Sequence, residues 1–331
     1  MKAVRVNSDG SVSVIELPIP QIGPGEALVR VRACGICGSD LLGWYVSKKA
    51  GTVLGHELSG EIVEVGAGVA DFSAGDRVVP HHHAPCLSCP VCRLSRFVHC
   101  AEWKASRLDP GGMAEFVRVP AGNLARDTLR IPEGLSDEEA SWTEPLATVV
   151  KAFQRGGFAA RQSLLVVGCG ATGQLAVRLG GALGASRVAA ADRVSSRLAL
   201  AAASGAGETV NVDRESLPGG FDFVFVGPGK NEAIRAGFEA VAPGGTLLLF
   251  TMAPPDERWE VAPYDLYFRE VTVVPSYSCG PDDTREALEL LASGRVKVAD
   301  LVTHRFPVER AVEAFERARD PEGSLKVVIT F

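Results

Sequence analysis

The spacing of apolar and polar positions predicts short strands over the first part of the chain. Residues 1–80 carry alternating apolar runs that glycine and proline interrupt, a pattern typical of a compact β-barrel. The strands expected there are residues 2–6, 12–17, 27–34, 58–65 and 77–79. Another strand is expected near residues 111–117, and Ser136 with Glu139 three residues later is a capping-box pattern that begins a helix.

From residue 163 onward the pattern alternates strands with helices. Residues 163–167 form a continuous apolar run, as expected of a strand buried on both faces of a parallel sheet. Further strands are predicted at residues 187–191, 209–212, 221–226 and 246–251, and helices at 171–183, 195–204 and 232–241. A turn is expected at Pro243-Gly244-Gly245. This alternation predicts an α/β fold with a doubly wound parallel sheet.

The last part of the chain changes character again. Its pattern predicts two amphipathic helices and a closing strand, at residues 283–293, 308–319 and 324–330. Because 331 residues exceed what one simple core accommodates, we expect more than one domain. The expected divisions are a first domain at residues 1–147, a second domain at 148–278 and a terminal segment at 279–331.

A glycine-rich loop, Gly168-Cys169-Gly170-Ala171-Thr172-Gly173, joins the strand at 163–167 to its helix. The first glycine allows a tight turn, the second lets a pyrophosphate approach the backbone, and the third permits close packing of helix and strand. Asp192 follows the next strand, where a carboxylate accepts both ribose hydroxyls and repels a 2′-phosphate. The loop therefore predicts bound NAD rather than NADP, a preference that Arg193 weakens, and Arg197 completes the candidate cofactor-binding residues.

Three metal-binding side chains lie within a short stretch of the first domain. Cys37, His56 and Glu57 offer a thiolate, an imidazole and a carboxylate. These are the ligands that a catalytic zinc takes while it keeps one coordination position open for substrate. The stretch therefore predicts an enzyme with a catalytic zinc.

Four further cysteines lie in a proline-bearing loop at residues 84–103, at Cys86, Cys89, Cys92 and Cys100. Four thiolates at this spacing can close a tetrahedral shell, which is how a structural zinc is held. The alternatives are two disulfides and an iron–sulfur cluster. A DNA-binding zinc ribbon is disfavoured, because two cysteine pairs separated by about 15 to 20 residues are absent.

Other cysteines and histidines are expected to be structural. His81-His82-His83 precedes the four-cysteine loop, but consecutive side chains point in different directions, so at most one of the three is expected near a site. Cys34 is interpreted as a buried strand residue, and His99 and His304 as structural side chains.

Composition limits the possible partners. A net charge of -6 argues against nucleic acid or an anionic membrane as the main partner, because both reward concentrated Lys and Arg. The N-terminus has no apolar run of signal-peptide length, and no segment has the apolar length of a membrane span. We therefore expect a cytoplasmic protein with a small-molecule substrate, in which the eight cysteines do not form a secretory disulfide framework.

Three of these segments resemble the zinc-containing medium-chain alcohol and polyol dehydrogenases. Gly55-His56-Glu57, followed by Gly60, Gly66 and Val69, is similar to the zinc signature of that family, and Cys34 to Asp40 is similar to its first ligand segment. The four-cysteine loop matches the family's structural-zinc lobe. The resemblance implies a GroES-like β-barrel catalytic domain, a Rossmann domain, a terminal segment that returns to the first domain, and a homodimer or homotetramer.

The resemblance also implies roles for individual residues. Glu144, in Glu144-Pro145-Leu146, approaches the catalytic zinc directly or through water, and whether Glu57 or Glu144 binds the zinc stays open. Ser39 matches the family's proton-relay hydroxyl, and Asp40 is expected to orient His56. Many relatives carry a histidine shortly after this Ser-Asp pair, whereas this chain has Leu41-Leu42-Gly43-Trp44.

The implied reaction transfers a hydride from a polyol or another secondary alcohol to NAD and forms a ketone, with two zinc ions per chain. Two alternatives stay open: a zinc-independent quinone or enone reductase on the same fold, and a non-enzymatic sensor that binds zinc and nucleotide. The sequence does not distinguish sugar alcohols, cyclitols, amino alcohols and diols, because pocket walls follow no spacing rule.

Overall fold

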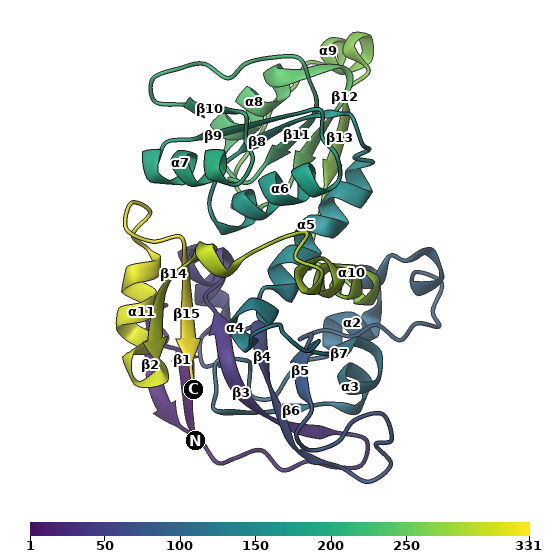
Figure 1. The fold of residues 1–331 in the computed structure, drawn as a ribbon, viewed down its shortest axis with the longest axis vertical. Helices are drawn as coiled ribbons and strands as arrows, with labels where there is room; N and C mark the ends of the chain where they lie inside the picture. Colours follow the sequence, from purple (N-terminus) through teal and green to yellow (C-terminus); the bar gives the residue numbers. More distant parts are fainter. The chain divides into compact units, whose positions relative to one another are not determined.

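A computed structural model describes residues 1–331 and divides the chain into two compact units (Figure 1). Unit 1 comprises Met1–Ala147, Cys279–Gly294 and Val298–Phe331, and unit 2 comprises Thr148–Ser278 and Arg295–Lys297. The chain first passes from unit 1 to unit 2 within helix α5 (Thr143–Gly156).

Unit 1 is built around a seven-stranded sheet with the order β14-β15-β3-β4-β5-β7, in which β6 also pairs with β3. A separate two-stranded sheet joins β1 and β2. The strands of unit 1 are β1 (Lys2–Val6), β2 (Val12–Glu16), β3 (Ala27–Gly35), β4 (Glu57–Val65), β5 (Arg77–Pro80), β6 (Phe116–Val119), β7 (Thr128–Arg130), β14 (Val302–Pro307) and β15 (Lys326–Thr330).

Short helices surround this sheet. They are α1 (Gly43–Val46), α2 (Ala101–Ala105), α3 (Ala121–Asp127), α4 (Asp137–Ala140), α10 (Pro281–Ala292) and α11 (Ala311–Ala318). Helix α4 begins with the predicted capping box, because the Ser136 hydroxyl accepts the backbone N–H of Glu139 at 3.2 Å and the Glu139 carboxylate accepts the backbone N–H of Ser136 at 3.1 Å.

The C-terminal strand β15 pairs antiparallel with one side of β3. Strand β4 pairs antiparallel with the other side of β3. In Figure 1 the yellow strand β15 lies between β14 and the purple strand β3. Ile329 stands opposite Cys34 in this pairing, and both side chains are fully buried. The last strand of the chain therefore completes the sheet beside the strand that leads to Cys37.

Unit 2 contains a six-stranded sheet with the order β10-β9-β8-β11-β12-β13, in which every pairing is parallel. The strands are β8 (Ser163–Val167), β9 (Arg187–Asp192), β10 (Glu208–Asn211), β11 (Phe221–Val226), β12 (Val241–Leu249) and β13 (Thr272–Pro275). The order reverses beside β8, where doubly wound sheets bind their ligands. The predicted α/β fold with a parallel sheet is confirmed.

Helices cover both faces of this sheet, namely α6 (Ala171–Ala182), α7 (Ser195–Ala203), α8 (Asn231–Ala240) and α9 (Pro263–Arg269). A Cβ at Gly180 of α6 would collide with Leu164, whereas one at Gly237 of α8 would approach Val224. Val224 pairs with Leu165 in the neighbouring strand, so these two side chains face the same side of the sheet. Leu164 precedes Leu165 along β8, so the side chain of Leu164 faces the opposite side. Helices α6 and α8 therefore pack on opposite faces.

Two predicted features differ from the structure. The strand expected near residues 111–117 begins only at Phe116, as β6, because residues 111–115 form no continuous strand pairing. The turn expected at residues 243–245 lies inside β12, which begins at Val241. Gly244 has φ +76°, and the pairing of β11 with β12 changes register between Phe221 and Phe223. The turn is therefore an irregularity within β12, because β12 pairs with β11 both before and after it.

No helix of the structure is long and apolar enough to cross a lipid bilayer.

Candidate functional site

The ends of two paired strands bring Cys37 and His56 together. Strand β3 ends at Gly35, which stands opposite Glu57, the first residue of β4. Cys37 follows β3 by two residues and His56 immediately precedes β4. Gly55 has φ +98°, and a Cβ there would collide with the backbone of the segment that follows the four-cysteine loop. The glycine therefore allows the chain to turn closely enough to present His56.

The segment after Cys37 is a short 3-10 helix, η1 (Gly38–Leu41), which holds Ser39 and Asp40. Asp40 Oδ2 accepts the backbone N–H of Cys37 at 3.3 Å, while Oδ1 is buried and has no hydrogen-bond partner. Burial disfavours the protonated form of His56, but the charges of Cys37 and Asp40 outweigh it and raise the pKa of His56 well above its usual value. Asp40 thus acts on His56 through charge, and Ser39 is partly exposed beside the ligands.

Cys37, His56 and Glu57 offer donor atoms that all lie within 4.8 Å of one another. Glu57 Oε2 forms a buried ion pair with Lys326 Nζ, which also donates to the carbonyl of Ile36 at 3.2 Å. Burial disfavours the charged lysine, but the charges of Glu57, Cys37 and Glu144 together more than offset this and raise the pKa of Lys326. Sequence reasoning missed Lys326, although a lysine inside the apolar run of β15 is a usable signal.

Glu144, in the first turn of α5, forms a second group with His81 and His82, whose donor atoms also lie within 4.8 Å of one another. Glu144 is 8% exposed, and burial, together with the nearby Glu57 carboxylate, raises the pKa of Glu144. The rings of His82 and His56 have centroids 5.2 Å apart, so the two groups adjoin. Sequence reasoning did not predict that Glu144 lies with two histidines.

The structure differs from the expectation that at most one of the three consecutive histidines lies near a site. The rings of His81 and His82 are perpendicular, with centroids 4.7 Å apart, and both residues join Glu144. They follow Pro80, the last residue of β5, so the alternation of a strand no longer separates their side chains. Burial and then the neighbouring His81 lower the pKa of His82 well below its usual value.

A buried hydrogen-bond network fixes the ring of His81. His81 Nδ1 lies 2.6 Å from Asp127 Oδ2, and Asp127 Oδ1 accepts the hydroxyl of Thr284 at 2.6 Å. The Cys279 Sγ lies 3.5 Å from His81 Nε2. Burial disfavours protonation of His81, but Asp127 outweighs it and raises the pKa of His81. Both ring nitrogens of His81 are therefore engaged by residues of unit 1.

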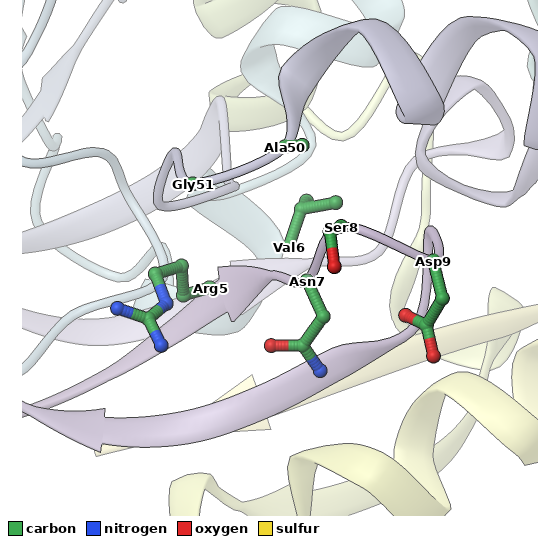
Figure 2. A pocket seen from close by; sticks show the side chains of 7 residues that line it. All are labelled: Arg5, Val6, Asn7, Ser8, Asp9, Ala50 and Gly51. Atoms are coloured by element: carbon green, nitrogen blue, oxygen red, sulfur yellow. The ribbon is translucent and has the colours of Figure 1, made fainter.

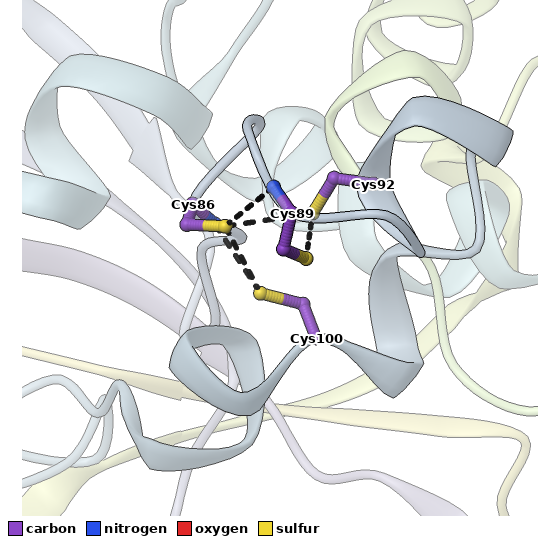
Figure 3. Close-up of side chains that lie close together, drawn as sticks. All are labelled: Cys86, Cys89, Cys92 and Cys100. Carbon is purple, nitrogen blue, oxygen red and sulfur yellow. Dashed lines mark hydrogen bonds between the residues drawn. The ribbon is translucent and has the colours of Figure 1, made fainter.

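The four cysteines of the loop converge on one point (Figure 3). The Sγ atom of Cys92 lies 3.9 Å from that of Cys86 and 3.4 Å from that of Cys89, and Cys86 and Cys100 are 3.6 Å apart. The Ser88 hydroxyl and backbone N–H groups lower the pKa of Cys86 to about 6. The loop therefore favours a thiolate at Cys86.

These sulfur separations fit a structural zinc. A tetrahedron whose centre lies 2.3 Å from each sulfur has edges of about 3.8 Å, close to the 3.4 to 3.9 Å found here. All eight cysteines of the chain are free, and bonded sulfurs would lie about 2.0 Å apart. The loop therefore fits one ion, and the disulfide alternative finds no support in the geometry.

The glycine-rich loop has the geometry that a dinucleotide needs. Gly168 has φ +89°, and a Cβ at Gly173 would collide with the carbonyl of Gly168, so helix α6 can begin this close to β8 only with glycine there. A Cβ at Gly170 would meet only Arg197 Nη1, at 3.9 Å. The middle glycine thus leaves open space above the backbone, where a pyrophosphate fits.

Asp192 ends β9, and backbone groups hold its carboxylate. Oδ2 accepts the N–H of Cys169 at 2.6 Å, and Oδ1 accepts those of Arg193 and Val194 at 2.7 and 2.9 Å. The Arg193 side chain forms an ion pair with Asp213 at 2.9 Å and is 74% exposed. The carboxylate is therefore oriented beside the glycine-rich loop, while Arg193 points to another acid.

An open surface pocket lies elsewhere in unit 1 (Figure 2). It is lined by Arg5, Val6, Asn7, Ser8, Asp9, Ala50 and Gly51. None of these residues belongs to the two histidine-containing groups or to the four-cysteine cluster. This pocket therefore does not include the groups of side chains that could hold a metal ion.

Comparisons with known proteins agree with this arrangement. A model of the alcohol dehydrogenase GroES-like domain matches residues 23–133, and a model of zinc-binding dehydrogenases matches residues 171–293. The chain is 32% identical to the L-threonine 3-dehydrogenase of Bacillus velezensis, over 99% of both proteins. It is also 32% identical to the sorbitol dehydrogenase of Gallus gallus, over 97% of this chain and 94% of that enzyme.

A solved structure extends the likeness to three dimensions. A candidate zinc-binding dehydrogenase from Sinorhizobium meliloti 1021, bound to NADP, has a TM-score of 0.90 and 30% identity, covering 100% of this chain and 99% of that one. These alignments include the barrel strands, the four-cysteine loop and the parallel sheet. The chain therefore belongs to the zinc-binding alcohol dehydrogenase family, whose members are oxidoreductases that use zinc and a nicotinamide dinucleotide.

Proposed function

We propose that this enzyme oxidises a polyol or another secondary alcohol to a ketone, with NAD as the hydride acceptor. The observation that carries the proposal is the meeting of Cys37, His56 and Glu57 at the ends of β3 and β4, within 4.8 Å of one another. One thiolate, one imidazole and one carboxylate hold zinc with a coordination position left for substrate. The sorbitol dehydrogenase of Gallus gallus supports a polyol as the substrate class.

Zinc held by these residues supplies a Lewis acid that makes a substrate hydroxyl more acidic. Lys326 holds one oxygen of Glu57, which orients the carboxylate and leaves its second oxygen for the metal. Glu144 lies next to this group and is the second carboxylate in reach of the metal, directly or through water. Ser39 lies two residues after Cys37 and relays the proton in this proposal: its hydroxyl takes the proton of the substrate hydroxyl as it passes its own proton to water.

The four cysteines are proposed to hold the second zinc, which shapes the loop of residues 84–103 and takes no part in the reaction. Their sulfur separations support this role, because a shell closed by four thiolates leaves no position for substrate.

We propose NAD rather than NADP as the cofactor of this chain. The support is the carboxylate of Asp192, which three backbone N–H groups orient and whose charge opposes a 2′-phosphate. Arg193 is engaged by Asp213. The structural relative from Sinorhizobium meliloti is bound to NADP, so the preference needs a direct measurement with both cofactors.

We also propose that the enzyme is a cytoplasmic homodimer or homotetramer. Its eight free thiols support a reducing compartment. Helix α9 exposes Tyr264, Tyr267 and Phe268, each at least 66% exposed, and β13 is the edge of the parallel sheet, both of which support a contact between copies. Light scattering after size exclusion measures the mass, and a strict monomer would contradict the oligomer.

The decisive experiment follows NADH absorbance with a panel of polyols, cyclitols, diols and threonine. Turnover of at least one hydroxyl compound, lost on removal of zinc by a chelator and restored by added zinc, is the expected result. An enzyme without zinc that reduces quinones or enones would instead support the zinc-independent reductase. NAD binding without turnover of any alcohol would support the sensor.

A further inference from the structure

The ammonium group of Lys326 lies inside unit 1, among contacts that can be followed one by one. The side chains of Lys326 and of its ion-pair partner Glu57 are 4% and 3% exposed. A lysine ammonium has three N–H donors. One donates to Glu57 Oε2, and another donates to the carbonyl of Ile36 at 3.2 Å. These two oxygen acceptors account for two of the three donors.

The indole ring of Trp142 provides a further contact for this ammonium. Lys326 Nζ stands over the ring, 5.1 Å from the ring centroid. A cation within about 6 Å of the centroid is attracted by the negative face of the ring. Because Trp142 is fully buried, water screens this attraction little. The ring face therefore adds to the oxygen contacts that hold the ammonium in place.

The N–H group of Trp142 does not explain why a tryptophan occupies this position. Its Nε1 is inaccessible to solvent and has no hydrogen-bond partner, whereas a buried indole N–H usually has one. The Nε1 of Trp103, another buried tryptophan of unit 1, donates to the carbonyl of Cys279 at 3.2 Å. The ring face of Trp142, and not its N–H, is thus the feature that its polar surroundings use.

The backbone of β3 leaves the space that the ion pair fills. A Cβ at Gly35 would collide with the Glu57 carboxylate and would lie 2.7 Å from Cε of Lys326. A side chain at residue 35 would therefore displace the carboxylate or the ammonium. With a glycine beneath the pair and an aromatic ring against the cation, the ammonium has a defined place beside Glu57.

We propose that Trp142 is a positioning residue of the open zinc site. Its ring face holds the Lys326 ammonium, which holds the Glu57 carboxylate beside the other two proposed ligands. The inference rests on the proposed function, because it assigns zinc to the group that contains Glu57. Groups that orient a metal ligand typically change metal affinity by about 10- to 100-fold when they are mutated. An indole ring can therefore support zinc binding without supplying a ligand atom.

The test measures the dissociation constant of the zinc that Cys37→Ser loses, by competition with a chromogenic chelator. Trp142→Leu removes the ring face, and the constant should rise roughly tenfold because the carboxylate is held less firmly. Trp142→Phe keeps a ring face and removes the unpaired N–H, so the constant should stay within about threefold of that of the unmodified enzyme. An equal loss in the two variants, or no loss in Trp142→Leu, would overturn the proposal.

A second background shows whether the ring acts through the cation. Lys326→Met removes the ammonium and leaves the ring with no charge to hold. In that background, Trp142→Leu and Trp142→Phe should have zinc dissociation constants within about twofold of each other. If the roughly tenfold difference between them persisted without the lysine, the ring would act only by filling space, and the proposal would fail.

A matched control removes another fully buried aromatic side chain of unit 1. Phe315 lies on α11, outside the groups that could hold a metal ion. Phe315→Leu should lower thermal stability through loss of packing and leave the zinc dissociation constant unchanged. Weakening of zinc binding as large as in Trp142→Leu would show that any loosening of the core releases the ion, which contradicts a specific role of the ring.

Unfolding separates this inference from the proposed function, because it needs neither substrate nor turnover. Denaturant midpoints are measured for Trp142→Leu, Lys326→Met and the double variant, and the double loss should be smaller than the sum of the single losses. Should Trp142→Leu not fold, Trp142→Met provides the same comparison. Additive losses would overturn the role of Trp142. Absence of zinc or of turnover in the unmodified enzyme would overturn the proposed function, and the unfolding measurement would still decide whether the ring holds the lysine.

Discussion

The two candidate zinc sites differ in the length of chain that builds them. The four cysteines that form one site lie between residues 86 and 100, in a single loop. The other site needs the ends of β3 and β4, and its Glu57 is held by Lys326 near the C-terminus. The comparison teaches that a closed structural site can be local, whereas a site with an open position depends on long-range contacts.

The electrostatics of the two sites differ in the same way. Hydroxyl and backbone N–H groups of the same loop lower the pKa of Cys86. At the other site, burial and charged groups from distant segments decide the pKa values of His56 and Lys326. A local mutation should therefore affect stability at the first site, and chemistry at the second.

The largest effect is expected from removing a ligand of the open site. Cys37→Ser should lower kcat by about a thousandfold or more, because the Lewis acid is lost. Dinucleotide binding and thermal stability should change little, and metal analysis should find one zinc in place of two. Activity equal to that of the unmodified enzyme would remove Cys37 from the metal site.

A ligand of the closed site should instead affect stability. Cys92→Ser should lower the free energy of unfolding by about 4 kcal/mol, since loss of a structural metal is among the most damaging single changes. Thermal unfolding and zinc content measure this effect, with Cys34→Ser as a buried-cysteine control outside the cluster. If Cys92→Ser abolished turnover while stability and zinc content stayed unchanged, the difference between the sites would disappear.

The long-range partner of Glu57 provides a third comparison. Lys326→Met should destabilise the fold by about 3 kcal/mol, because it leaves a buried carboxylate unpaired. Adding Glu57→Gln to Lys326→Met should recover part of the stability lost, since the double change removes both charges. Denaturant unfolding of the three variants measures this coupling, and simple additivity would show that the pair is not coupled.

The smallest effect is expected at the candidate dinucleotide site, where the glycine-rich loop and Asp192 lie close in sequence. Asp192→Ala should reduce the ratio of kcat/KM for NAD to that for NADP by about tenfold, the effect of about 1.4 kcal/mol in binding. Asp213→Ala tests the second determinant separately, because it frees Arg193 without removing the ribose acceptor. An unaltered ratio in Asp192→Ala would exclude Asp192 from the ribose site.

Strong local patterns predicted several elements to the residue. The strands at 163–167 and 221–226 have the predicted bounds, because continuous apolar runs end at polar residues or glycine. By contrast, β13, β14 and α9 were not predicted. Helix α9 has no buried residue and three exposed aromatic side chains, so no amphipathic period marks it.

The candidate site residues were likewise predicted only in part. The spacing of Cys86, Cys89, Cys92 and Cys100 identified a cluster that the structure brings together. The neighbours of Glu144 and the partner of Glu57 were not predicted, because no short-range period relates residue 57 to residue 326 or residue 144 to residue 81.

The amino-acid sequence by itself determined the α/β class, the glycine-rich loop and the cysteine cluster, because periodicity and close spacing express local geometry. Only the tertiary structure decided that Lys326 holds Glu57, that His81 and His82 meet Glu144, and that β15 closes the sheet beside β3. The burial of a side chain and the identity of its contact partner depend on segments far apart in the chain. They are therefore determined only in the folded structure, where the sheet brings these segments together.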